Sequence, residues 1–211
     1  MDNSLVLHNK MPIVNNSAKC LQVRQMKDAT PSYVPHLSKD EVMRIGECLK
    51  ERDRLLLFLL FDGCFRISEA LGIRPKDISH LDNGGYSATV TGKGNRMREV
   101  AISAEIANRL LSYSYDKGVG KDELIFPIGR CRAWRMIDKA MRQAGVVKPD
   151  RVGTVHVMRH SGALERLSIL GNPRAVQHQL GHASPRTTLR YMETQAQKES
   201  LQIQATVDYK W

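Results

Sequence analysis

The amino-acid sequence predicts an α+β fold that is mainly α-helical, with a helical bundle and a small antiparallel β-sheet. Three observations support this prediction. Residues 55–60 are apolar without interruption, as in a buried helix. Residues 86–90 alternate between apolar and polar side chains, which is typical of a β-strand. Residues 156–193 have helical patterning, broken at prolines that suit the first turn of a helix.

The length of 211 residues suits one large domain or one domain with a tail. The composition, with 42% hydrophobic and 26% charged residues, is typical of a soluble globular protein. Residues 1–36 have no sustained apolar period and are predicted to form a tail or arm, too short for a DNA-binding domain of its own. The main domain is predicted over residues 37–195, followed by a C-terminal segment over residues 196–211.

The chain is strongly basic. Lys and Arg together number 32 and Asp and Glu number 22, which gives a formal net charge of +10. Such an excess favours a polyanionic partner, most often nucleic acid. On charge alone, a basic protein without such a partner is an equally good interpretation.

Several classes of protein do not fit the sequence. The four cysteines are far apart and no Cys/His ligand spacing occurs, so we expect neither a zinc site nor a disulfide framework. Polar residues interrupt residues 1–14, which therefore do not resemble a signal peptide. The apolar run at residues 55–61 is too short to cross a membrane. We expect a cytoplasmic protein without membrane contact.

The first predicted helix begins at Ser38, which can form a capping box with Glu41. A second helix is predicted over residues 51–62, and its apolar run at residues 55–60 should be buried. A short amphipathic helix follows Arg66 and stops before Pro75, which cannot continue it.

The sheet is predicted from its turns. Asn83-Gly84-Gly85 and Gly92-Lys93-Gly94-Asn95 flank the first strand, and residues 98–102 form the returning strand. Ser103 is predicted to cap the next helix, which extends through Leu111.

A helix predicted over residues 130–144 has one basic and one apolar face. The basic side chains recur at helical spacing: Arg132, Arg135, Lys139 and Arg142. The apolar stripe consists of Trp134, Ile137, Met141 and Ala144. Because Asp138 is the only acid available for pairing, we expect the basic face to contact phosphates or a groove of DNA. A solvated charged face is the alternative.

The remaining chain is predicted to be helical over residues 156–169, 173–180 and 185–193. Residues 195–205 are compatible with one more short helix.

Six chemically active side chains stand at defined points of these elements: Arg66, Lys93, His156, Arg159, His182 and Tyr191. A phosphodiester under attack gains negative charge on its non-bridging oxygens. Guanidinium groups stabilise that charge well, because they are planar, permanently charged and bidentate. Arg66 and Arg159 are therefore the predicted phosphate-binding residues, and the two imidazoles can add donors or move a proton.

Tyr191 is the predicted nucleophile. A phenol has an unperturbed pKa of about 10, so it needs a base or strongly cationic surroundings to attack. Lys93, on its Gly-flanked turn, can protonate the leaving oxygen. Tyr209 is a rival nucleophile, although it lies near a chain end where order is least expected. His160 is expected to be structural and His178 to be a surface residue.

These motifs resemble the catalytic domain of the tyrosine recombinase, or phage integrase, family. The resemblance rests on His-x-x-Arg at 156–159, Leu-Gly-His at 180–182, a tyrosine nine residues after that histidine, Arg-x-x-Glu at 66–69 and the hairpin lysine. It covers about residues 36–195 and includes every catalytic position of the family, in order.

The resemblance implies a role for each residue. The two arginines would hold the scissile phosphate, and Lys93 would protonate the leaving 5′-oxygen of DNA. His156 would assist proton transfer at the tyrosine, and His182 would donate to the phosphate. Tyr191 would become joined to the DNA 3′-phosphate. The implied protein is a site-specific recombinase or integrase that needs no metal or other cofactor.

The implied partner is double-stranded DNA, with a homotetramer assembled on paired sites and with accessory DNA-binding proteins. Many family members have an N-terminal helical domain, which residues 1–36 cannot form. The chain is therefore expected to be either a trimmed piece or one of the short recombinases. In the family the C-terminal end packs on a neighbouring protomer, for which Leu201, Ile203 and Val207 offer apolar contacts. Packing on their own core is the alternative.

Three other functions fit these residues less well. A type IB topoisomerase uses a similar set of residues, but the spacing from Leu-Gly-His to Tyr191 has the recombinase form. A regulatory DNA-binding protein that does not cut would have no use for this tyrosine. A metal-dependent nuclease would need a cluster of acidic residues, and none is apparent.

Overall fold

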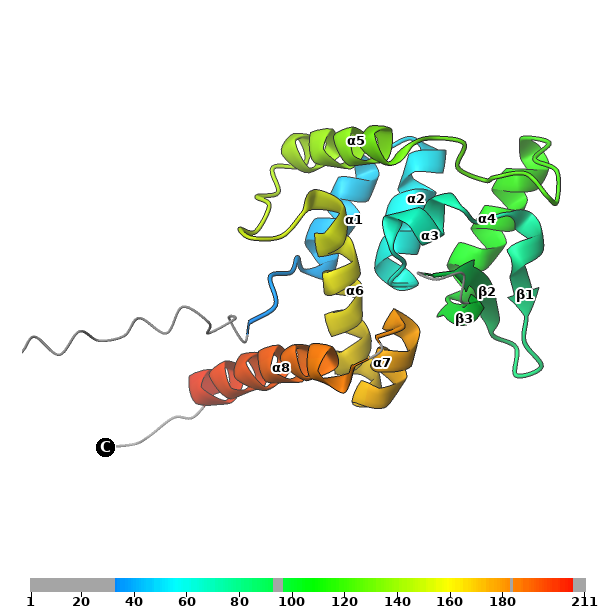
Figure 1. Cartoon of the computed structure of the whole chain (residues 1–211). Coiled ribbons are helices and arrows are strands. Elements are labelled where there is room, and N and C mark those ends of the chain that lie inside the picture. Colours follow the sequence, from blue (N-terminus) through cyan, green and yellow to red (C-terminus); the bar gives the residue numbers. More distant parts are fainter. Residues whose placement is uncertain (1–32, 93–96, 183, 207–211) are drawn as a thin grey trace, which may run out of the picture. The chain divides into compact units, whose positions relative to one another are not determined.

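The computed structural model describes residues 33–92, 97–182 and 184–206 (Figure 1). The described elements, in chain order, are α1 (Lys39–Glu47), α2 (Glu51–Asp62), α3 (Ile67–Leu71), the 3₁₀ helix η1 (Pro75–Asp77), β1 (Ile78–His80), β2 (Tyr86–Thr91), β3 (Met97–Ile102), α4 (Ala104–Asp116), α5 (Arg130–Gln143), α6 (Thr154–Leu170), α7 (Pro173–Leu180) and α8 (Pro185–Thr206). The predicted fold class, mainly helical with a small antiparallel sheet, is confirmed.

Lys93, Val207 and Tyr209 lie outside the described residues, as do the side chain of Ile203 and most of the arm predicted at the N-terminus. Among the described helices, none is long and apolar enough to cross a membrane.

The first two helices form as predicted. The Glu41 backbone N–H donates to Ser38 Oγ at 3.2 Å, and the Ser38 backbone N–H donates to Glu41 Oε2 at 2.8 Å, so the capping box is complete. All six residues of the apolar run at 55–60 are buried. Helix α2 packs against α4 and α6, and this contact makes it the centre of the core.

The turn after α2 sets the start of α3. Cys64 adopts a positive φ of 53°, and a Cβ on Gly63 would overlap the Phe65 ring at 2.1 Å. Arg66 then stands at the N-cap position of α3. On the opposite side, a Cβ on Gly162 of α6 would lie 1.8 Å from the Phe61 carbonyl oxygen. The absence of a side chain at Gly162 therefore lets α6 approach the end of α2.

The sheet has three strands in the order β1-β2-β3, all antiparallel. The sequence predicted β2 and β3, which pair from Tyr86↔Ile102 to Thr91↔Met97. Strand β1 was not predicted, because three residues are too few for an alternating pattern to be detected. Gln179 of α7 ties β3 to the helices, with its Nε2 donating to the Ala101 oxygen at 2.7 Å and to the Gly63 oxygen at 2.9 Å.

Two predictions about helices are wrong in detail. The structure has one continuous helix, α8, in place of separate helices over 185–193 and 195–205, because no Gly or Pro interrupts residues 186–206. In α5, Ile137 and Met141 are buried as predicted, but Trp134 is 47% exposed. Ala133 and Ala140 are buried instead, so the packed face is rotated towards these small residues.

Residues 33–37 form a strap across the C-terminal helices. The Val34 backbone N–H donates to Thr194 Oγ1 of α8 at 2.8 Å, and the Leu37 backbone N–H donates to Ser161 Oγ of α6 at 2.8 Å. The Val34 side chain belongs to a second apolar cluster, built with residues from α6, α7 and α8, that includes Tyr191. The strap therefore fixes α8 against α6.

Candidate active site

Four predicted residues come from four different elements. Arg66 begins α3, Arg159 lies in α6, His182 follows α7 and Tyr191 lies in α8. Arg159 is only 3% exposed. Its Nη1 donates to the Cys64 oxygen at 2.5 Å and its Nη2 donates to the Leu180 oxygen at 2.6 Å. This guanidinium thus joins the turn after α2 to the end of α7.

The Glu69 carboxylate lies at the centre of three guanidinium groups. Arg66 donates to it twice, from the backbone N–H to Oε2 and from Nη1 to Oε1, both at 2.8 Å. Arg98 of β3 donates from Nη1 to Oε1 at 2.8 Å and from Nη2 to Oε2 at 3.1 Å. Arg159 Nη1 lies 3.7 Å from Oε2. Three positive charges share one negative charge, which leaves a surplus of two.

This surplus persists at neutral pH. Burial disfavours the Glu69 carboxylate, but the hydrogen bonds from Arg98 and Arg66 outweigh burial and lower the pKa of Glu69. Burial, together with the charge of Arg66, lowers the pKa of Arg159 to about 10, so Arg159 stays protonated. The arrangement can therefore attract and hold an anion such as a phosphate.

Tyr191 is surrounded differently. Its side chain is 3% exposed, within the second apolar cluster, and its hydroxyl lies 2.6 Å from His160 Nδ1. Burial raises the pKa of Tyr191 to about 12, although the charge of Arg159 opposes this shift. At neutral pH the phenol is protonated, and it needs a base before it can attack.

The surrounding imidazoles are neutral at pH 7. Burial, with the proximity of His156 and Arg159, lowers the pKa of His160 to about 4. Burial and the charges of Arg159 and Arg66 lower the pKa of His182 to about 4 as well, and its Nδ1 lies 3.2 Å from Thr188 Oγ1. A neutral imidazole at His160 can accept the proton of the phenol.

His160 was predicted to be structural, and His156 was expected to serve the tyrosine. In the structure, the ring that reaches the Tyr191 hydroxyl is that of His160. The ring of His156 lies 5.5 Å from that of His160, one helical turn away. The spacing of four residues was the available signal, because it places both imidazoles on one face of α6. His178, predicted to lie at the surface, is exposed.

The four basic residues predicted to contact DNA are all exposed on α5: Arg132, Arg135, Lys139 and Arg142. Arg142 Nη2 pairs with Asp138 Oδ2 at 2.8 Å, so one of the four shares its charge with an acid of the same helix. The face is therefore basic and open to solvent, as phosphate contacts require.

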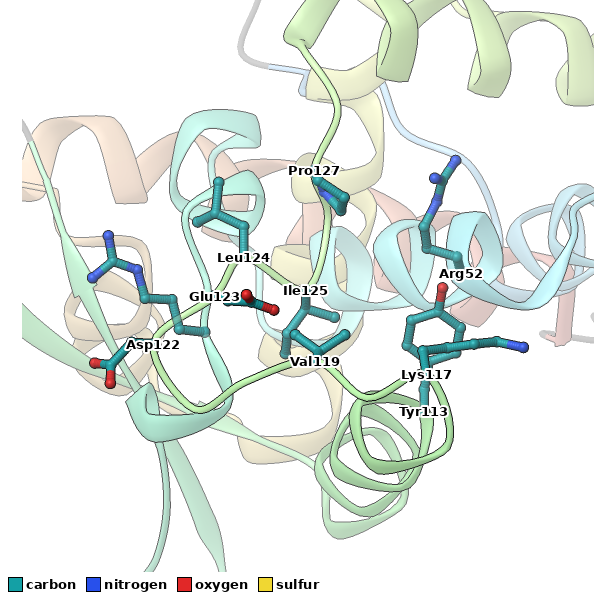
Figure 2. A pocket seen from close by; sticks show the side chains of 10 residues that line it. Arg52, Tyr113, Lys117, Val119, Asp122, Glu123, Leu124, Ile125 and Pro127 are labelled. Carbon is teal, nitrogen blue, oxygen red and sulfur yellow. The ribbon is translucent and has the colours of Figure 1, made fainter.

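A cavity of about 570 Å³ lies apart from this cluster of charges, next to α2 and α4 (Figure 2). Apolar side chains of the segment after α4, among them Val119, Ile125 and Pro127, lie beside Arg52 and Lys117 there. None of the predicted site residues that the structure describes lines it. Within the described ranges, no group of three or more His, Cys, Asp or Glu side chains is placed to hold a metal ion.

Comparison with known proteins agrees with the fold and the motifs. The chain matches the phage integrase family over residues 17–198. The tyrosine recombinase XerD of Corynebacterium glutamicum is 32% identical over 150 residues, which are 66% of this chain and 47% of that protein. The tyrosine recombinase XerC of Rhodospirillum centenum is 35% identical over 153 residues, 69% of this chain and 43% of that protein. The chain thus spans about half the length of these curated relatives.

The fold is also similar to that of solved recombinases. The crystal structure of the XerH site-specific recombinase bound to its difH substrate, a pre-cleavage complex, matches with a TM-score of 0.66 at 24% sequence identity. The match covers 80% of this chain and 53% of that chain. At this identity the likeness establishes the fold alone, and the resemblance drawn from the motifs is confirmed by the family match.

Proposed function

This chain belongs to the phage integrase family, and from that membership and the geometry of its site we propose that it is a site-specific DNA recombinase. It cleaves and rejoins DNA strands through a covalent 3′-phosphotyrosyl intermediate. The observation that carries the proposal is the pairing of an anion site with a nucleophile. Arg66 and Arg159 lie around Glu69 with a surplus of positive charge, and the ring of His182 lies 6.2 Å from that of Tyr191.

The proposed reaction uses groups of the chain alone. Arg66 and Arg159 hold the non-bridging oxygens of the scissile phosphate, and His182 donates a further hydrogen bond. The Tyr191 oxygen attacks the phosphorus while its proton passes to His160 Nδ1. The bond from phosphorus to the 5′-oxygen breaks, and Lys93 gives that oxygen a proton. A 5′-hydroxyl of another strand reverses these steps, so the strands are rejoined without a cofactor.

The buried phenol sets a condition on this reaction. The Tyr191 hydroxyl has little contact with solvent and is engaged by His160. For the Tyr191 hydroxyl to reach a phosphate bound at the arginines, either α8 or the DNA strand must therefore shift. We expect this shift to accompany DNA binding, so that cleavage is coupled to correct assembly.

The proposed partner is double-stranded DNA, bound by a homotetramer on paired sites, with accessory DNA-binding proteins. The basic face of α5 supplies phosphate contacts outside the site. On α8, Leu189, Met192 and Leu201 are exposed apolar side chains, and Leu201 is 67% exposed. Their exposure supports a contact between this helix and a neighbouring protomer.

The test uses duplex DNA that carries a nick beside the cleavage point, so that the short cut end diffuses away and the covalent product accumulates. Candidate sites come from DNA that flanks the coding sequence and from random duplexes selected by binding to the Tyr191→Phe variant. The wild type should give a DNA-linked protein band on a denaturing gel, unaffected by a chelator. Tyr191→Phe should give none, whereas Tyr115→Phe, at an 86% exposed position on α4, should behave as wild type.

Other outcomes would change the assignment. A band that survives Tyr191→Phe would move the nucleophile to Tyr209 or elsewhere. Cutting that stops in chelator and leaves no protein on the DNA would reject the phosphotyrosyl mechanism. Relaxation of supercoiled DNA without sequence preference would favour a type IB topoisomerase.

A further inference from the structure

Arg98 is a charged residue of the site that the six predicted positions do not include. It lies in β3, and its side chain is 17% exposed. Both of its terminal nitrogens donate to the Glu69 carboxylate, one to each oxygen. Because the Glu69 side chain is 1% exposed, Arg98 is part of the interior of the charge cluster and not of its rim.

The other flank of Arg98 lies against the Leu-Gly-His turn. Gly181 has a positive φ of 60°, and a Cβ at this position would lie 2.7 Å from Arg98 Nε. That nitrogen is buried and has no hydrogen-bond partner among the described residues. Arg98 and His182 also line one cavity of about 360 Å³, together with Arg174. Arg98 therefore lies between Glu69 and the segment that carries His182.

We propose that Arg98 is a positioning residue that acts through Glu69 and gives the phosphate site its third guanidinium. This inference rests on the proposed function. By occupying both oxygens of Glu69, Arg98 weakens the hold of that carboxylate on Arg66 and Arg159. Their remaining N–H groups are then available to the phosphate, and the surplus of positive charge rises from one to two.

The charge surplus matches the chemistry. A phosphodiester carries one negative charge, and attack by an oxygen nucleophile places additional negative charge on the non-bridging oxygens. Without Arg98, only two guanidinium groups would balance two anions, the Glu69 carboxylate and the phosphate. Loss of Arg98 should therefore weaken the stabilisation of negative charge on the reacting phosphate, in addition to any effect on folding.

The experiment compares two nicked substrates. One has an ordinary scissile phosphate, and the other has a methylphosphonate, in which a methyl group replaces one charged oxygen. For Arg98→Met we expect covalent product from the phosphate to form about 10²-fold more slowly. For the methylphosphonate, the rate should fall less than about tenfold, because this uncharged group does not require the third guanidinium. DNA binding is measured separately in the Tyr191→Phe background.

Further variants separate positioning from a structural role. Adding Glu69→Gln to Arg98→Met should recover part of the rate, because the competing carboxylate is then neutral. Arg109→Met removes one positive charge from α4, where Arg109 pairs with Glu105 at 3.7 Å, and should leave the substrate ratio at its wild-type value. If Arg98→Met does not fold, Arg98→Lys takes its place, since lysine cannot donate to both oxygens in parallel, and the ratio should shift in the same direction by less.

The outcomes are distinct. An unchanged ratio of phosphate to methylphosphonate cleavage in the folded Arg98 variant overturns the inference, as does a double variant slower than Arg98→Met. Absence of covalent product from the wild type on either substrate rejects the proposed function itself.

Discussion

Glu69 and Tyr191 are both buried, yet their surroundings are opposite in character. Around Glu69, three guanidinium groups and a backbone N–H occupy the carboxylate. Around Tyr191, apolar side chains and one neutral imidazole hold a protonated phenol. The first region can hold an anion as it stands, because its charges are fixed and hydrogen-bonded. Under the proposed function, the second region would withhold the nucleophile until α8 or the DNA strand shifts, and this difference would separate DNA binding from cleavage.

The largest effect is expected from a substitution that disrupts the charged region around Glu69. Glu69→Ala leaves two poorly exposed arginines, Arg98 and Arg159, without their shared carboxylate, and should lower the free energy of unfolding by about 3–5 kcal/mol. Urea denaturation followed by circular dichroism measures the loss. Glu105→Ala, which breaks an exposed pair on α4, should cost less than about 1 kcal/mol. Equal losses in the two variants would contradict the buried role of Glu69.

The same residue gives the charged region a pH dependence. Its pKa is lower in the folded chain than in the unfolded chain, so its stabilisation is complete above the ordinary value of about 4.3. That stabilisation is lost as the pH falls below this value. We expect a Glu69→Gln variant to be less stable than wild type at pH 7 and the gap to narrow towards pH 3.

The next prediction tests the nucleophile region. His160→Ala should slow covalent product formation about 10²-fold at pH 7, because the phenol loses its base. Its rate should then rise about tenfold per pH unit from pH 7 to 9, since only the phenolate fraction attacks and the pKa of Tyr191 is raised to about 12. The wild-type rate should be nearly flat there, because His160 is already neutral above pH 4.

His178→Ala, at an exposed position of α7, is the control and should resemble wild type. A flat profile for the His160 variant would show that another group takes the proton, and His156, one turn away on α6, would be the next to test.

The smallest effect is expected from a substitution on α5, whose basic side chains are exposed to solvent and belong to neither the Glu69 region nor the Tyr191 region. Arg135→Ala should weaken DNA binding several-fold and lower the salt slope by about one. Titrations by fluorescence anisotropy at several salt concentrations measure both. Arg109→Ala on α4 is the matched loss of charge and should leave the slope unchanged. A slope equal to wild type for Arg135→Ala would remove α5 from the DNA interface.

Local patterns predicted the fold well. The capping box at Ser38, the cap at Ser103 and the apolar helix α2 depend on residues close in sequence, and each forms as predicted. Strand β1 and the exposure of Trp134 depend on distant partners, which no local period records. Local sequence patterns therefore predict the features that depend on neighbouring residues, but not the features that depend on packing between elements.

The site shows the same limit. Arg66, Arg159, His182 and Tyr191 could be selected because their motifs are short and ordered along the chain. Arg98 could not, since its importance arises only when β3 is laid beside Glu69 and Gly181. The contact of His160 with the phenol likewise depends on how α8 crosses α6.

The strap at residues 33–37 adds a mechanical consequence. Its two hydrogen bonds end on Thr194 and Ser161, on the helices that carry Tyr191 and Arg159. The strap therefore couples the two helices, and a displacement of residues 33–37 would move α8 relative to α6 and change the distance between Tyr191 and Arg159.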